Sequence, residues 1–92
     1  SLIIEIGTAF GGLAKALNKI AKEYRIKFIT YDILENDYSK QLPTFGVDFR
    51  LENIFIETPS WCEYTLKQHV QEEFNQYYAP RLFLCDGGNK LY

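Results

Sequence analysis

Apolar and polar positions in the first 32 residues follow two different periods. Residues 2–6 are nearly all apolar and β-branched, which is typical of a strand buried on both faces of a parallel sheet. From residue 11 to residue 24, apolar side chains recur every three or four positions opposite lysines, which predicts an amphipathic helix. Residues 26–32 are again mostly apolar and predict a second strand. Strand, helix and strand make a βαβ unit, so we expect parallel neighbouring strands and an α/β fold.

The rest of the chain predicts two further strands and one further helix. Residues 47–51 alternate apolar and polar side chains, as a third strand near a sheet edge would. Residues 60–63 have the Ser-x-x-Glu form of a capping box, which predicts the start of a helix that Pro80 would end. The buried stripe of that helix would be Leu66, Val70, Phe74 and Tyr77. Residues 81–86 predict a fourth, buried strand, and residues 34–46 no more than a short helix and a turn.

Composition bounds the class of protein. With 92 residues, of which 47% are hydrophobic and 16% aromatic, the chain is expected to form one globular domain. The net charge of -2 provides no field for nucleic acid or an acidic membrane, so we expect neither as a partner. No run approaches the ~18 apolar residues of a membrane span. Cys62 and Cys85 lack the spacing of metal ligands or of a disulfide scaffold, which predicts reduced thiols and a cytoplasmic location.

Candidate binding residues gather where the predicted strands end. Glu5 interrupts the first apolar run, and three glycines between residues 7 and 12 follow it. Glycines permit a tight turn and close approach of the backbone to a ligand, beside the free N–H groups of the helix start. Asp32 ends the second strand, where a carboxylate can accept hydrogen bonds from both hydroxyls of a ribose. The pattern predicts an adenosine-type cofactor; the alternative is that the glycines only let helix and strand pack closely.

The spacing of the glycines bears on which cofactor this is. The dinucleotide fingerprint G-x-G-x-x-G brings its second glycine against a pyrophosphate, whereas here Gly7 is followed by three other residues before Gly11. Glu5, two residues before Gly7, would also place negative charge beside the phosphates. A cofactor that carries a cationic amine suits this pattern better.

The segment EIGTAFGG resembles the first motif of class I S-adenosylmethionine-dependent methyltransferases. It is closest to the E-x-G-x-x-x-G variant of small-molecule O-methyltransferases and the cephalosporin-hydroxylase-like group. TYDI is similar to the second, acidic motif of the family, and LFLCDGGNK to its fourth-strand motif. The resemblance implies a Rossmann-like domain of three α/β/α layers with strand order 3-2-1-4. Residues 1–92 would be its truncated, N-terminal half, and the activity would be methylation of an oxygen of a small molecule.

The resemblance also implies roles for single residues in holding S-adenosylmethionine. Gly7 and Thr8, in the turn that Gly11 closes, would contact the methionine part. Glu5 would support the turn or the amino group of the cofactor. Asp32 would hold the ribose hydroxyls. The adenine would meet Asn53 or its neighbour Glu52, just past the third strand.

Asp86 and Lys90 are the candidates for catalysis. In metal-dependent members of the family, an acid at the end of the fourth strand helps to hold Mg²⁺ and a nearby lysine acts on the accepting hydroxyl. Asp86 would then be a catalytic residue and a metal ligand, with oxygen donors that suit this hard ion, and Lys90 its catalytic partner. The alternative is that Asp86 only caps the following glycine turn.

Two other functions share part of this pattern. A nicotinamide-linked oxidoreductase has the same βαβ unit and an acid in the position of Asp32. A methyltransferase-derived module would bind a cofactor or a protein without turnover. In either case half a domain leaves two sheet edges open, through which copies of the chain could form a homo-oligomer. His69, the single histidine, is interpreted as a structural or surface residue.

Overall fold

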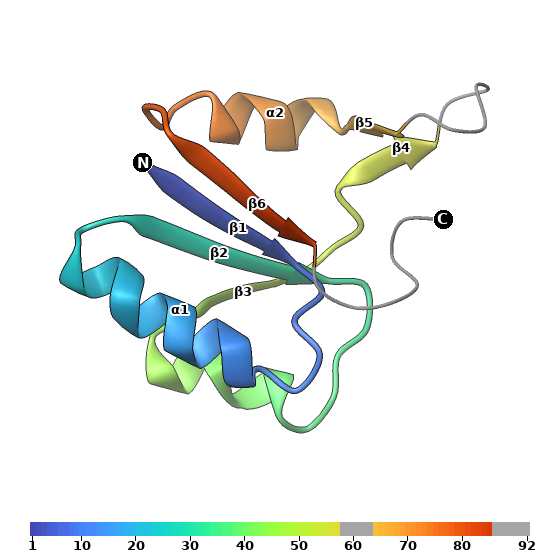
Figure 1. Ribbon diagram of the computed structural model, residues 1–92. Coiled ribbons are helices and arrows are strands. Elements are labelled where there is room, and N and C mark those ends of the chain that lie inside the picture. Colours follow the sequence, from blue (N-terminus) through green and yellow to red (C-terminus); the bar gives the residue numbers. More distant parts are fainter. Residues whose placement is uncertain (58–63, 86–92) are drawn as a thin grey trace.

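The computed structural model describes residues 1–57 and 64–85 and contains one four-stranded sheet (Figure 1). The strands are β1 (Leu2–Ile6), β2 (Lys27–Asp32), β3 (Asp48–Leu51) and β6 (Arg81–Cys85). They lie in the order β3-β2-β1-β6, and each neighbouring pair is parallel. The predicted α/β class and the predicted order, with β6 as the fourth strand of the sheet, are confirmed.

Helices cover both faces of this sheet (Figure 1). The helix α1 (Gly12–Glu23) and the 3-10 helix η1 (Ser39–Phe45) lie on one face, and α2 (Gln68–Phe74) lies on the other. Successive side chains of a strand point to opposite faces, so the strands supply two separate cores. The core on the α1 side contains Ala14, Ala21, Phe28, Leu42 and Val47. The core on the α2 side contains Leu2, Ile4, Ile6, Ile29, Tyr31, Ile54, Val70 and Phe74.

The chain changes face at the middle of the sheet. The connections from β1 to β2 and from β2 to β3 use α1 and η1 on one face. The connection that leads back to β6 uses α2 on the other face, and β6 pairs on the far side of β1. In open parallel sheets, such a change of face separates the loops that leave the two neighbouring strands and opens a crevice at their carboxyl ends.

The prediction of a helix from residue 60 is wrong at its start. Tyr64–Leu66 is a strand, β5, which pairs antiparallel with β4 (Phe55–Glu57), so Leu66 is not part of a helix. Tyr and Thr favour strands, and here the pairing with β4 outweighs the helical period. The capping box at residues 60–63 lies outside the described residues. Val70 and Phe74 do form the buried stripe of α2, but the helix ends at Phe74, so Tyr77 follows it and packs against the core from outside the helix.

The fourth strand is not buried, contrary to the prediction. Among the described residues, β6 lies at the edge of the sheet with a partner strand on one side only, and Leu82 and Phe83 are about half exposed. β3 begins at Asp48, one residue later than predicted. Cys85 carries a free, exposed thiol. No helix in the described part of the chain is long and apolar enough to cross a membrane.

Candidate functional site

The loop after β1 is a tight turn that depends on glycine. Gly7 has a φ of 106° and Gly11 a φ of 86°, both in the left-handed region that favours glycine. A Cβ on Gly11 would lie 2.9 Å from Cδ2 of Leu42, so this position also excludes a side chain by contact. Ala9 adopts a φ of 50° between them. The loop therefore folds back closely before α1 begins.

A buried chain of hydrogen bonds supports this turn from below. Thr30 on β2 donates through Oγ1 to Oε1 of Glu5 over 2.6 Å. Oγ1 of Thr8 lies 2.8 Å from Oγ1 of Thr30 and acts as the donor, because the Thr30 hydroxyl proton is directed at Glu5. All three residues are buried. Of the two roles expected for Glu5, the geometry favours support of the turn.

Asp32 contacts the turn directly from the end of β2. Its Oδ2 accepts a hydrogen bond of 3.1 Å from the N–H of Ala9, and its Oδ1 accepts from the N–H groups of Ile33 and Leu34 over 2.8 and 3.3 Å. Asn36 donates through Nδ2 to the carbonyl of Ala9 over 2.9 Å. Ala9 is therefore held from both sides. The three N–H groups take three of the about four acceptor positions of the carboxylate, which stays partly exposed.

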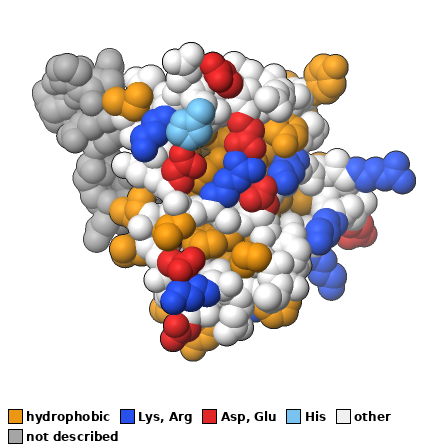
Figure 2. Space-filling view, turned by 180° about the vertical axis from the view of Figure 1, so that it is seen from behind, with side chains coloured by type: hydrophobic (Ala, Val, Ile, Leu, Met, Phe, Trp, Pro, Cys, Tyr) orange, Lys and Arg blue, Asp and Glu red, His pale blue; other side chains and the backbone are white. Residues whose placement is uncertain are grey.

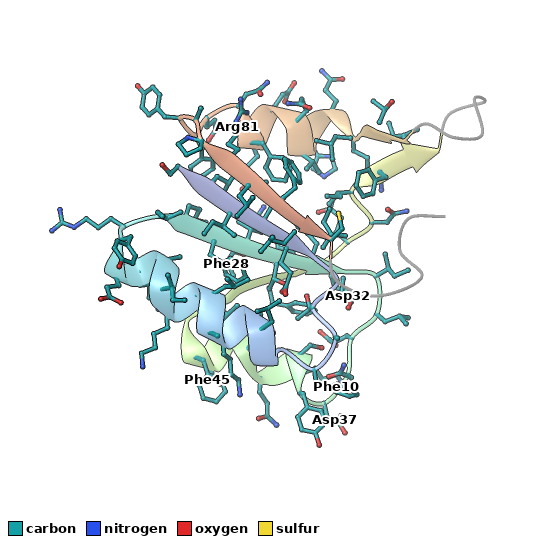
Figure 3. The ribbon with its side chains drawn as sticks, in the orientation of Figure 1. Phe10, Phe28, Asp32, Asp37, Phe45 and Arg81 are labelled. Carbon is teal, nitrogen blue, oxygen red and sulfur yellow. The ribbon has the colours of Figure 1, made fainter. Side chains whose placement is uncertain are left out.

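Exposed apolar side chains surround this carboxylate, and sequence reasoning did not assign them a role. Phe10 on the turn packs edge to face against Tyr38 with ring centroids 5.5 Å apart. Ile33 and Leu34 directly follow Asp32, and all four side chains are exposed. Figure 3 shows Asp32 at the end of its strand and Phe10 on the loop below it. Exposed apolar patches mark contact sites, and the signal was present in the sequence as apolar residues within a polar segment.

Glu52 and Asn53 lie beside this site, and the N–H of Glu52 donates a hydrogen bond of 2.9 Å to the carbonyl of Asp32. Leu51, the last residue of β3, is the register partner of Asp32, so Glu52 and Asn53 come just past the end of β3. The Oδ1 of Asn53 accepts a hydrogen bond of 3.2 Å from the N–H of Phe55, and Oε1 of Glu52 contacts Nε2 of His69. No hydrogen bond within the described ranges joins the Asn53 side chain to Asp32 or to the turn.

A network of charged side chains lies where β3 meets α2, on the face opposite α1. Arg50 donates to both carboxylate oxygens of Asp48 over 3.0 Å and also contacts Glu73. Nζ of Lys27 lies 2.9 Å from Oδ2 of Asp48. Figure 2 shows acidic and basic side chains gathered near the single histidine on this side. The network connects the outermost strand β3 to α2.

Three pKa values are displaced in this network. The hydrogen bonds to Glu73 and Asp48 raise the pKa of Arg50 above its usual value. Burial alone would raise the pKa of Asp48, but the hydrogen bonds and charges of Arg50 and Lys27 outweigh it and hold the pKa below its usual value. Burial raises the pKa of Tyr31 to about 12, although Arg50 acts in the opposite direction. The charges of this network are satisfied by one another, which is typical of a structural role.

Asp86 and Lys90, the predicted catalytic and metal-binding residues, lie outside the described residues. The last described residue of β6, Cys85, pairs with Ile6 at the end of β1. Within residues 1–57 and 64–85, no group of three or more His, Cys, Asp or Glu side chains is arranged to hold a metal ion. The site in the described residues therefore consists of the backbone of the glycine turn, the Asp32 carboxylate and the exposed apolar side chains around it.

Comparisons with known proteins gave no match to this chain, whether among family models, curated proteins or solved structures.

Proposed function

We propose that this chain is the cofactor-binding part of a Rossmann-like, S-adenosylmethionine-dependent methyltransferase domain. The strand order with helices on both faces supports this arrangement, and so does the change of face beside β1. The proposed cofactor would lie across the carboxyl ends of β1 and β2, where the glycine turn and Asp32 meet. The resemblance of the sequence motifs to this family points to the same place.

One observation carries the proposal: the Asp32 carboxylate reaches the glycine turn and is hydrogen bonded to the N–H of Ala9. A ribose held by this carboxylate would lie directly beside the turn, where a Cβ is excluded at Gly11. Binding of both ribose hydroxyls needs two acceptor positions, and about one is free. Ligand binding would therefore displace the Ala9 N–H from Oδ2 and open the turn.

The same residues favour S-adenosylmethionine over a dinucleotide. Ala9 stands where the second glycine of a dinucleotide turn brings its backbone to a pyrophosphate. The carboxylate of Glu5, linked through Thr30 to Thr8 of the turn, adds a carboxyl group close to that position. Such a group opposes phosphate and suits a cofactor with a cationic amino group and sulfonium.

In the proposed reaction, S-adenosylmethionine supplies a methyl group made reactive by its sulfonium. Asp32 would orient the ribose, and Gly7 and Thr8 would line the amino-acid part. Ile33 and Phe10 would cover the adenosine and exclude water from it, since their side chains are exposed at the rim. This catalysis relies on positioning for in-line displacement.

An oxygen of a small molecule is the acceptor that the family resemblance favours. Asp86 would hold Mg²⁺ and, with Lys90, act on the accepting hydroxyl. A cytoplasmic location is the setting that the two cysteines predict.

Calorimetric titration of the chain with S-adenosylmethionine and, separately, with NAD tests the proposal. Saturable binding of S-adenosylmethionine with much weaker binding of NAD is the expected result. Binding of NAD alone would favour an oxidoreductase, and binding of neither would favour an interaction module; both results overturn the proposal.

A further inference from the structure

The two edges of the main sheet differ in how they are protected. The β3 edge carries Asp48 and Arg50 in a strand of four residues, and both belong to the network of charges described above. The β6 edge contains one charged residue, Arg81, followed by Leu82, Phe83, Leu84 and Cys85. Within the described ranges, no strand pairs with the outer side of β6.

The one charge on β6 does not protect its edge. Arg81 donates through Nη1 to the carbonyl of Phe74 and to Oδ1 of Asn75, over 3.2 and 3.1 Å, so it is held at the end of α2 (Figure 3). Natural sheets block their free edges with charges, prolines, bulges or very short strands. Between Leu82 and Cys85 the strand has none of these, and its outward N–H and C=O groups form a template for another strand.

No described element covers the α1 side of β6 (Figure 1). Leu82 pairs in register with Ile3, which packs into the core on the α1 side, so Leu82 points to that same face and is 51% exposed. One flank of α1 faces away from β6. On this flank, Lys15, Asn18, Lys19 and Lys22 line a hollow together with Phe45 and Val47. The other flank carries the exposed apolar side chains Leu13, Ile20 and Tyr24. An apolar surface thus continues from this flank of α1 to the free edge.

We propose that β6 pairs antiparallel with β6 of a second copy of this chain, about a two-fold axis at Phe83. This pairing is self-complementary, as a two-fold interface requires. Leu82 lies opposite Leu84 of the second copy, and Arg81 lies opposite Cys85, so no like charges meet. The two sheets become one continuous sheet of eight strands, and the apolar flanks of both α1 helices face each other across the joined strands.

The size of this contact sets the expected strength. Five residues of strand and the half-exposed Leu82 and Phe83 make a small interface, at the low end of the range for specific complexes. We therefore expect a dimer whose population depends on concentration, with a dissociation constant on the order of 10 to 100 µM.

Sedimentation equilibrium of the 92-residue chain from about 5 to 500 µM tests the proposal, because this range brackets the expected dissociation constant. The wild-type chain should pass from monomer to dimer and stop there. Leu82→Lys should raise the dissociation constant at least about tenfold, since it places two like charges at the joined edge. Leu51→Lys is the matched control, because Leu51 is 53% exposed on the opposite edge strand, and it should change the constant less than about twofold.

Three results would overturn the proposal. One is a monomer over the whole range, which would leave the edge to a different partner. Another is an equal effect of the two lysine variants, and the third is growth beyond the dimer. Thermal melting of each variant checks that it is folded.

The register has its own test. With Cys62→Ser, a spin label on Cys85 reports the distance between the two copies by electron paramagnetic resonance. Antiparallel pairing centred at Phe83 places the two Cys85 Cα atoms about 14 Å apart, whereas parallel pairing in register would place them about 5 Å apart. The shorter distance would contradict the proposed axis.

Discussion

Thr30 on β2 donates a hydrogen bond of 2.6 Å to Glu5 on β1, and both side chains are fully buried. The two residues are register partners in the parallel β1–β2 pair. Thr8, the first residue after Gly7, extends this connection into the glycine turn. The acid that interrupts an apolar strand in the sequence is therefore part of the support for the turn.

Thr30→Val should lower the free energy of unfolding by about 1 to 3 kcal/mol, because it removes a buried donor to a carboxylate while keeping the shape of the side chain. Urea denaturation measures the change. Thr44→Val is the matched control, since Thr44 is exposed and its hydroxyl donates to the carbonyl of Gln41, and it should cost less than about 0.5 kcal/mol. Equal costs for the two variants would contradict the support assigned to Thr30.

Gly11 and Gly12 should respond in opposite directions to alanine. Gly11→Ala places a Cβ at a φ of 86° and 2.9 Å from Leu42, and should cost at least about 1 to 2 kcal/mol. Gly12 begins α1, and a Cβ there meets nothing within 4 Å. Gly12→Ala should therefore stabilise the chain by up to about 1 kcal/mol. The midpoints of thermal unfolding report both, and a stabilising Gly11→Ala would contradict the described turn.

The chain should lose stability in acid partly through Asp48. Its pKa in the folded chain is lowered, so its contribution is complete above the unfolded pKa of about 3.9 and is lost as the pH falls through the folded value. Asp48→Asn should be less stable than wild type at pH 6 and should lose less stability between pH 6 and pH 2. Asp37→Asn, at an exposed acid outside the network, should follow the wild-type curve. Parallel curves for Asp48→Asn and wild type would argue against the network.

Tyr31 should have the opposite effect in alkali. Its pKa is raised to about 12 in the folded chain, so its contribution is complete below the unfolded pKa of about 10 and disappears as the pH rises through the folded value. Tyr31→Phe should therefore lose less stability than wild type between pH 9 and pH 11 in urea denaturation. Tyr78→Phe, at an exposed tyrosine, should match wild type, and identical losses in all three chains would be evidence against burial of the Tyr31 hydroxyl.

The elements with a clear hydrophobic period could be predicted from the sequence. Residues 2–6 and the helix after them appear as predicted, because their period alone decides between strand and helix. The meeting of Asp32 with the turn also follows, since parallel strands bring their carboxyl ends to the same edge. These features depend on local pattern and on the handedness of one crossover.

The remaining features depend on pairing that a single sequence does not encode locally. Thr30 becomes visible as a partner of Glu5 only when the register of β1 and β2 is known. The strands β4 and β5 have three residues each, too few for a period, and their pairing displaced the start of α2. Burial of β6 could not be predicted, because an apolar strand has the same composition at the edge as in the middle of a sheet.

The most direct test of the central claim compares S-adenosylmethionine binding by three variants in one calorimetric series. Asp32→Ala should weaken binding at least about tenfold, as loss of hydrogen bonds to a charged group predicts. Asp37→Ala removes an exposed acid from the same loop and should leave the affinity unchanged (Figure 3). Asn36→Ala loosens the hold on Ala9, which binding must displace from Asp32, and leaves the carboxylate in place, so it should leave the affinity unchanged or raise it. Unchanged affinity of Asp32→Ala would contradict the account.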